Sequence, residues 1–308
     1  MKWLLAVISM VLVGCGERAA TPAEPESEEL RLVALSPAIA VMLRDLGLED
    51  RIVGRHEYDL ALSKSIPSMG HQQLIDYEAL IEANPTHVIL EWGERDLPGK
   101  LTNLAGRNGW AVMNYRMESI DQIAEAWDDL ALDLRGGGPA EPIDRSGVIP
   151  RYDPNRLETD LPSTRLASAL RPIESDVSAV GGVLLLAGGD PPGVLGPGSV
   201  HHEVLVRLGA VPAIAEGSPW MSLDLEDMLG LAPGAIVLVA PRTPGTDAAE
   251  PTAEDIRERL GRLGELAIPA IESGRVALID DPYALLGGSA IIDFAGDLRE
   301  ILEGWARD

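Results

Sequence analysis

The sequence predicts an α/β protein made of two similar lobes, and an internal repeat is the main reason. Segment 76–90 (DYEALIEANPTHVIL) recurs as segment 224–238 (DLEDMLGLAPGAIVL), at a constant offset of 148 residues (224 minus 76). Each copy begins with an Asp that can cap a short helix, then passes a proline into an apolar run typical of a buried strand. Because so short a helix is unstable alone, it must pack on the sheet that its own strand joins.

Two further observations support this fold class. Apolar residues at 32–35 predict a strand, and Ser36 followed by Pro37 predicts the capped start of a helix over 38–46. The run 51–54 predicts the next strand, so the chain opens as a βαβ unit. With 308 residues, the chain is long enough for two such domains.

The remaining elements alternate in the same way. Apolar periodicity in the first lobe, residues 31–135, predicts a helix over 97–108, a strand over 110–113 and a helix over 119–134. In the second lobe, residues 182–308, it predicts a strand at 183–186, helices over 200–208 and 252–266, a strand at 275–279 and a terminal helix over 290–305.

The lobes are connected by residues 136–181. Glycines and prolines up to residue 163 predict a flexible insert. The following stretch, 165–180, is the natural bridge between the lobes if it forms one helix, although Pro172 would kink or end it.

The amino terminus has the features of a lipoprotein signal. A positive start precedes an apolar run over 3–13 that is too short to span a bilayer, and the chain's single cysteine, Cys15, follows. Residues 1–15 therefore predict a signal peptide with a lipobox, and 16–30 a flexible tether. An ordinary signal peptide with an incidental cysteine is the alternative. The expected location is extracytoplasmic, with Cys15 lipid-anchored to a bacterial membrane.

Composition and motifs exclude several functions. The net charge of −24 argues against nucleic acid and anionic membrane surfaces as partners, since both repel a polyanion. The chain has no G-x-S-x-G nucleophile elbow, P-loop or dinucleotide fingerprint. Adjacent residues on a helix diverge by about 100°, so His201 and His202 rarely share one metal ion. A metal-dependent hydrolase built on His56, His201 and Asp281 remains as an alternative of a different class.

Aromatic residues indicate a binding site for a flat ligand. The chain has six Trp, five Tyr and one Phe, and four of these twelve fall in loops after or between predicted sheet elements, namely Tyr58, Trp92, Trp220 and Tyr283. Rings in such places grip flat ligands with little entropy to lose. His201 begins a helix after a sheet-edge loop and is a further candidate contact.

Two acids occupy matching places in the repeat. Glu78 and Glu226 each lie in the first turn of a predicted helix, where the helix dipole stabilises a carboxylate. Beyond that structural role, a matched pair of acids could dock onto arginines of a two-fold symmetric partner, one contact per lobe.

Four stretches together resemble a known family. They are RLVALSPAIAVMLRDLGLEDRIVG, the first repeat copy, VLLLAGGDPPGVLGPGSVHHEVLVRLGA and SPWMSLDLEDMLGLAPGAIVLV. Over residues 31–134 and 182–304 the chain resembles the class III (helical-backbone) solute-binding proteins that serve ABC importers of cobalamin, haem and ferric siderophores. The resemblance implies two α/β lobes joined by a single long helix, with little hinge motion and a ligand cleft between the lobes.

The cobalamin-binding members show the nearest residue matches. The resemblance implies pocket aromatics at Tyr58, Trp92 and Trp220 with Tyr283 near another, a cleft-lining loop at Ser36, Pro37 and Ala38, and transporter-docking acids at Glu78 and Glu226.

The expected function is therefore that of a binding protein, not an enzyme, which captures a cobalamin-like corrinoid and delivers it to an ABC permease dimer. It needs no cofactor of its own. Haem and ferric siderophores are alternative ligands; Tyr58, His56 or His201 could ligate haem iron, whereas the chain has no arginine cluster to grip an anionic siderophore. A receptor that signals rather than transports is a third class.

Overall fold

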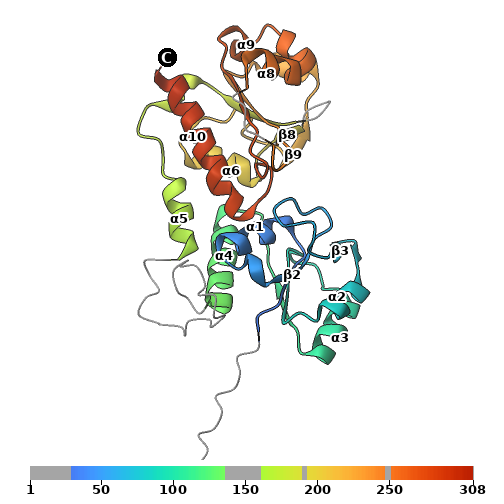
Figure 1. The fold of residues 1–308 in the computed structure, drawn as a ribbon. Helices are drawn as coiled ribbons and strands as arrows, with labels where there is room; N and C mark the ends of the chain where they lie inside the picture. Colours follow the sequence, from blue (N-terminus) through green and yellow to red (C-terminus); the bar gives the residue numbers. More distant parts are fainter. Residues whose placement is uncertain (1–28, 136–160, 189–192, 247–250, 308) are drawn as a thin grey trace, which may run out of the picture.

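The computed structural model describes residues 29–135, 161–188, 193–246 and 251–307, which form two α/β lobes (Figure 1). The predicted two-lobed fold class is confirmed. The lipobox, the tether before residue 29 and most of the predicted insert lie outside the described residues. No helix within those ranges is long and apolar enough to cross a membrane.

The amino-terminal lobe contains a parallel four-stranded sheet in the order β2-β1-β5-β6. Apolar clusters lie on both of its faces, so the central strands β1 and β5 are apolar runs without alternation. The strands are β1 (Leu32–Ala34), β2 (Ile52–Arg55), β5 (His87–Leu90) and β6 (Ala111–Asn114). The other elements are α1 (Pro37–Asp45), η1 (Glu49–Arg51), the hairpin of β3 (Gly70–His71) and β4 (Leu74–Ile75), α2 (Tyr77–Ala83), α3 (Gly99–Asn108) and α4 (Ile120–Arg135).

The carboxyl-terminal lobe has a five-stranded sheet in the order β11-β10-β7-β8-β9, in which β8 and β9 run as an antiparallel extension. Its strands are β7 (Val183–Ala187), β8 (Gly193–Leu195), β9 (Trp220–Ser222), β10 (Ala235–Val239) and β11 (Val276–Ile279). The helical elements are α6 (Val200–Arg207), α7 (Leu225–Leu231), α8 (Ala253–Leu260), η3 (Gly261–Glu265), α9 (Pro269–Glu272), η4 (Gly288–Ala290) and α10 (Ile291–Arg307).

The internal repeat is visible in the caps of α2 and α7. Asp76 accepts the backbone N–H groups of Glu78 and Ala79, and Asp224 accepts that of Asp227. The two helices also end alike, at Asn84 and Ala232, with φ of 41° and 44°. Among the described residues, these are the only two besides glycine with positive φ. The duplication therefore extends from sequence to backbone conformation.

The predicted single long helix between the lobes is wrong. Helix α5 (Pro162–Ala169) ends before Pro172, and the later part is a separate 3-10 turn, η2 (Val177–Val180). The proline ring clashes with the carbonyl one turn back and disfavours helical geometry in the residue before it, so one helix cannot continue through 172. Within the described residues, α4 and α5 pack side by side at the junction instead.

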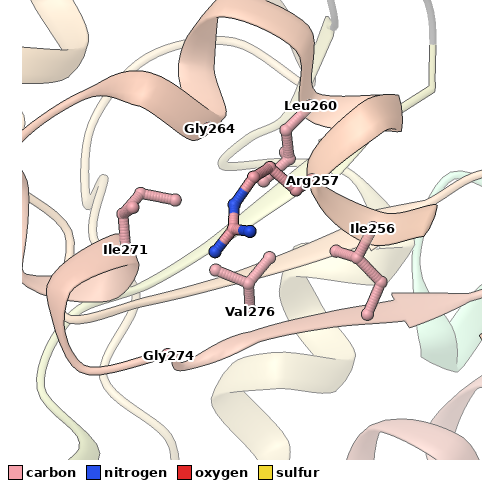
Figure 2. Close-up of a pocket in the computed structure, with 7 residues that line it drawn as sticks. All are labelled: Ile256, Arg257, Leu260, Gly264, Ile271, Gly274 and Val276. Atoms are coloured by element: carbon pink, nitrogen blue, oxygen red, sulfur yellow. The ribbon is translucent and has the colours of Figure 1, made fainter. Parts of the chain in front are cut away.

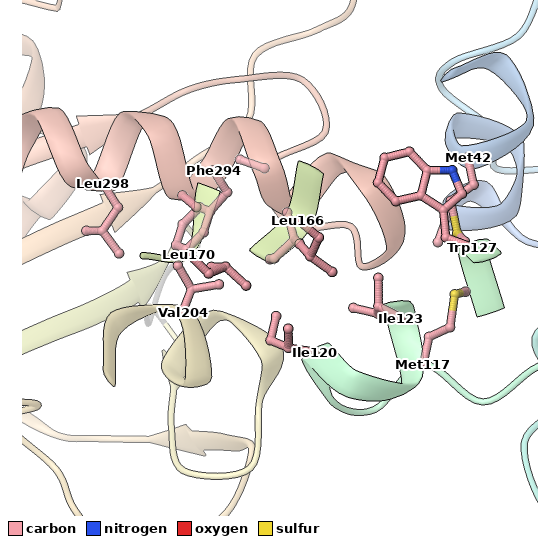
Figure 3. Close-up of a cluster of buried hydrophobic side chains, with 14 of the residues drawn as sticks. Met42, Met117, Ile120, Ile123, Trp127, Leu166, Leu170, Val204, Phe294 and Leu298 are labelled. Carbon is pink, nitrogen blue, oxygen red and sulfur yellow. The ribbon is translucent and has the colours of Figure 1, made fainter. Parts of the chain in front are cut away.

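The largest hydrophobic core runs through both lobes (Figure 3). Trp127 and Ile123 of α4 belong to this core together with side chains of the second lobe and of α5. Members drawn in the figure include Met42, Met117, Ile120, Leu166, Leu170, Val204, Phe294 and Leu298. Two smaller clusters lie within one lobe each. Because close-packed side chains resist sliding, this shared core opposes rotation of one lobe against the other.

Polar contacts reinforce the same junction. The backbone N–H of Ile120, at the start of α4, donates to Glu203 Oε2 on α6 at 2.9 Å. Arg207, one turn after Glu203, donates to both Glu203 and Asp121 at 2.7 Å. A carboxylate from one lobe thus satisfies a free helix-terminal N–H of the other.

Candidate functional site

The loops that follow the carboxyl ends of the two sheets meet at the junction. Helix α1 follows β1, and the loop after β11 leads into η4, which packs on α1. Gly288 is required there, because its φ is +71° and a Cβ would lie 3.2 Å from the Ala38 carbonyl oxygen. In open α/β sheets, ligands bind outside the carboxyl ends of the strands, so this side of each lobe is the candidate site.

Three rings gather after β2 on the rim of the first lobe. Tyr58 is 63% exposed, and its ring centroid lies 5.6 Å from that of His71 and 5.7 Å from that of His56. His56 is buried, and its Nδ1 accepts the backbone N–H of Tyr58 at 3.1 Å. Burial and the neighbouring His71 lower the pKa of His56, so its ring is held neutral. The hairpin of β3 and β4 brings His71 to this cluster.

A buried aspartate fixes the loop that carries Tyr58. Asp59 Oδ1 accepts the backbone N–H groups of Ala61 at 3.0 Å and Leu62 at 2.7 Å, and Lys64 donates to the Asp59 carbonyl. Burial raises the pKa of this carboxyl. Its Oδ2 has no hydrogen-bond partner within the described part of the chain. These bonds hold the turn in one conformation and so present the Tyr58 ring on a rigid base.

The sequence predicts that Ser36 caps the helix that follows it, but its hydroxyl does not cap α1. Ser36 stands at the N-cap, but its Oγ donates to Glu91 Oε2 at 2.8 Å. Burial raises the pKa of Glu91, while the hydrogen bond from Ser36 acts in the opposite direction. Ser36 and Ala38 are buried, and only Pro37 of the predicted cleft-lining loop keeps partial exposure.

Two of the four predicted pocket aromatics already have partners in the protein. The Trp92 Nε1–H donates to the Asp96 carbonyl at 3.0 Å, and the Arg95 guanidinium lies 4.7 Å from the Trp92 ring centroid. Tyr283 accepts a hydrogen bond from Arg44 at 3.2 Å, and that guanidinium lies 4.9 Å from its ring centroid. Trp92 thus supports its own loop, and Tyr283 joins the two lobes.

Trp220 is the most exposed aromatic residue in the described part of the second lobe. It lies on the edge strand β9 and is 57% exposed. Its ring lies over Gly193 of the neighbouring strand, where a Cβ would be 2.1 Å from Trp220 Cζ2. The glycine therefore lets the indole lie flat against the sheet with its other face in solvent.

His201 does not belong to the site. It is buried, its Nε2 lies 2.8 Å from the Ala284 carbonyl oxygen, and its ring meets Phe294 edge-on. The alternative of a metal-dependent hydrolase therefore lacks one of its three candidate residues. A second one, Asp281, caps its own turn by accepting the Tyr283 backbone N–H at 2.7 Å. In the described ranges, no three His, Cys, Asp or Glu side chains are grouped to hold a metal.

The two acids expected to dock a transporter are both accessible. Glu78 and Glu226 are exposed in the first turns of α2 and α7, and neither forms an ion pair with a described residue. A groove of about 500 Å³ adjoins Glu78 and is also lined by Leu74, Tyr77 and Lys100.

A separate cavity of about 180 Å³ lies in the second lobe between α8, α9 and β11 (Figure 2). The Arg257 side chain extends among Ile256, Ile271 and Val276 there. Val276 is the first residue of β11, so this cavity lies at the amino end of that strand, away from the carboxyl-end loops. It is therefore distinct from the candidate site.

The chain was compared with protein families, curated sequences and solved structures. No protein-family model and no curated protein sequence matches the chain. Several solved structures match its fold. The periplasmic haem-binding protein HutB of Vibrio cholerae is 17% identical, with a TM-score of 0.64, over 89% of this chain and 99% of its own.

Two other solved structures match similarly. The vitamin B12-binding protein BtuF of Vibrio cholerae is 15% identical, with a TM-score of 0.58, over 90% of this chain and 98% of its own. A periplasmic haem-binding protein of Pseudomonas aeruginosa is 22% identical, with a TM-score of 0.60, over 88% of this chain and 92% of its own. The chain thus has the two-lobed fold of the class III solute-binding proteins.

Proposed function

We propose that this chain is an extracytoplasmic receptor that binds a tetrapyrrole between its lobes and delivers it to an ABC importer. One observation carries the proposal: each lobe presents one strongly exposed ring, Tyr58 or Trp220, on a rigid base. A tetrapyrrole is broad and flat, and aromatic rings offer it apolar contact at little entropic cost. The similarity to proteins named as binding haem or vitamin B12 supports this ligand class.

A corrinoid is the first candidate ligand. Its rim carries mostly neutral amides, which suit a protein with a net charge of −24 better than an anionic chelate does. Stacking on Tyr58 and Trp220 and amide hydrogen bonds would hold it, with no covalent step.

Haem is the second candidate, and the ring cluster after β2 favours it. Iron accepts a tyrosinate or a neutral imidazole as axial ligand. Tyr58 and His71, 5.6 Å apart between ring centroids, offer both kinds of donor on one rim.

Titration with cyanocobalamin and with haemin, followed by tryptophan fluorescence and visible absorption, tests the ligand class. We expect binding of one of them, weakened about tenfold by Tyr58→Ala or Trp220→Ala, because each removes a central aromatic contact. Val206→Ala, a change at a 48% exposed aliphatic residue of α6, is the control and should bind normally.

Tyr58→Phe separates the two ligands, because it keeps the ring and removes the oxygen. A changed haem spectrum in this variant indicates axial ligation, whereas unchanged corrinoid affinity indicates stacking alone. No binding of either ligand to the wild type would overturn the proposal.

Delivery depends on Glu78 and Glu226, which we propose bind cationic side chains of the permease dimer. Alanine at both positions should leave ligand affinity intact and weaken association with the cognate ABC permease. Loss of ligand binding in that variant would contradict the docking role.

The membrane anchor is the proposed lipid on Cys15. Cells expressing the chain should incorporate labelled fatty acid into it, and Cys15→Ser should abolish that label. A chain that remains unlabelled while fractionating outside the cytoplasm would argue for an ordinary signal peptide.

A further inference from the structure

Helices α2 and α7 share a second exposed feature besides their acids. Ile81 is 50% exposed and Leu229 is 49% exposed, and they stand at the same position of the repeat, 148 residues apart (229 minus 81). Each follows the docking acid of its helix by three residues, so acid and aliphatic side chain lie on one helix face.

The fold does not need these two side chains to be apolar. The neighbouring residues Leu80 and Met228, also 148 apart, supply the buried contacts of the two helices. Single exposed aliphatic residues are ordinary on protein surfaces. Here, however, the exposed residue recurs at the same place on both helices, together with an accessible carboxylate and the same left-handed C-cap.

We infer that Ile81 with Glu78, and Leu229 with Glu226, form two equivalent docking patches for a two-fold symmetric partner. Each equivalent half of that partner would present a cationic side chain beside an apolar hollow. The inference rests on the proposed function, in which the partner is the permease dimer, and it adds an apolar contact to the ionic one.

The duplication and the charge of the patches favour this occupant. A two-fold partner presents the same surface twice, so a duplicated receptor can satisfy it with two copies of one patch. Both patches are acidic, with Glu82 next to Ile81 and Asp227 next to Glu226. Two such patches repel each other, so a cationic partner fits them better than a second copy of this chain.

Association of the ligand-loaded chain with its cognate ABC permease in nanodiscs, measured by biolayer interferometry, tests the inference. We expect Ile81→Ser and Leu229→Ser each to weaken the association about tenfold, because each loses buried apolar area at the contact. The two losses should multiply in the double variant, to about a hundredfold, since the patches lie on different lobes and contact separate halves of the partner.

Matched controls separate this effect from general surface changes. Val206→Ser and Val211→Ser alter aliphatic residues that are 48% and 47% exposed outside these helices, and both should associate normally. Thermal melts followed by circular dichroism check that every variant is folded, and ligand affinity should stay unchanged throughout.

Several results would overturn the inference. If only Glu78→Ala and Glu226→Ala weaken association, docking stands but the apolar contact does not. If one serine variant has an effect and the other has none, the patches are not equivalent. Self-association of the wild type that the double variant abolishes would identify a second copy of this chain as the occupant. If no variant at either patch weakens association, the docking part of the proposed function fails as well.

Discussion

At the residue scale, a group of carboxyl side chains around α10 carries an electrostatic cost. Partial burial raises the pKa of Asp297 to about 6, and the nearby Asp281, Asp293 and Glu300 add to the shift by like charge. The folded-state pKa therefore lies above the unfolded value of about 3.9. Between these two pKa values the folded protein keeps the Asp297 proton while the unfolded chain has lost it. The free energy of unfolding therefore falls as pH rises from the lower value to the higher one, and it stays lower at higher pH.

Asp297→Asn should consequently stabilise the protein at neutral pH. It removes the charge and keeps the shape, and we expect the melting temperature at pH 7 to rise by about 2 °C. Below pH 4 the wild type is protonated as well, so the difference between the two proteins should vanish. Differential scanning calorimetry at pH 3.5, 5 and 7 measures this.

A control acid outside the carboxyl group around α10 tests whether the stabilisation comes from removing the Asp297 charge. Glu254→Gln on α8, which neutralises an exposed acid outside the cluster, should not raise the melting temperature at pH 7. An Asp297→Asn difference that is equally large at pH 3.5 would mean that the substitution acts through packing and not through ionisation.

At the element scale, the C-caps of α2 and α7 differ in how well each residue type tolerates the same backbone conformation. Both helices end with a left-handed residue, which is Asn84 in one and Ala232 in the other. Asparagine tolerates this region, whereas alanine has a Cβ that clashes with the following carbonyl oxygen, at a cost of about 1 kcal/mol. The second copy thus stores strain that the first avoids.

Ala232→Gly should therefore raise the free energy of unfolding by about 1 kcal/mol, because glycine adopts positive φ without the clash. Urea unfolding measures the change. Asn84→Gly should have a smaller effect. Ala79→Gly within α2 is the opposite control and should destabilise by about 1 kcal/mol. Destabilisation by Ala232→Gly would show that the alanine side chain contributes more than its strain.

At the scale of the whole molecule, the shared core makes the two lobes one folding unit. Buried side chains of α4 and of the second lobe belong to one hydrophobic core, and Glu203 crosses the junction to the start of α4. Losing either lobe would expose this core to water, so neither can unfold without a large penalty to the other.

We expect calorimetry to show a single unfolding transition, with equal calorimetric and van't Hoff enthalpies. Trp127→Ala in the shared core should destabilise it by about 3–5 kcal/mol. Leu184→Ala and Leu80→Ala, each in a core of one lobe, should lower the same transition by about 2–5 kcal/mol. Two resolved transitions, with each single-lobe variant moving only its own, would refute the shared unit.

Much of the fold was predictable because its signals are local. The Asp caps at 76 and 224, the Ser-Pro start of α1 and the apolar strands at 183 and 235 are each encoded within a few neighbouring residues. The stop at Pro172 was equally local, and only the expected continuation of the helix was wrong. Strand β8 was missed because a glycine-rich stretch predicts turns unless its pairing partners are known, and β9 because it is only three residues long and follows Ser218-Pro219.

The sequence by itself determined the duplication and the positions of the acids in the two repeat helices, because capping and periodicity act over one or two helical turns. Tertiary structure alone decided which candidate site residues are free. Tyr283 pairs with Arg44, which is 239 residues away, and His201 bonds to Ala284, 83 residues away. Ser36 likewise turns to Glu91. Burial and partnership depend on groups distant in the chain, and only the folded protein leaves Tyr58 and Trp220 as the exposed rings.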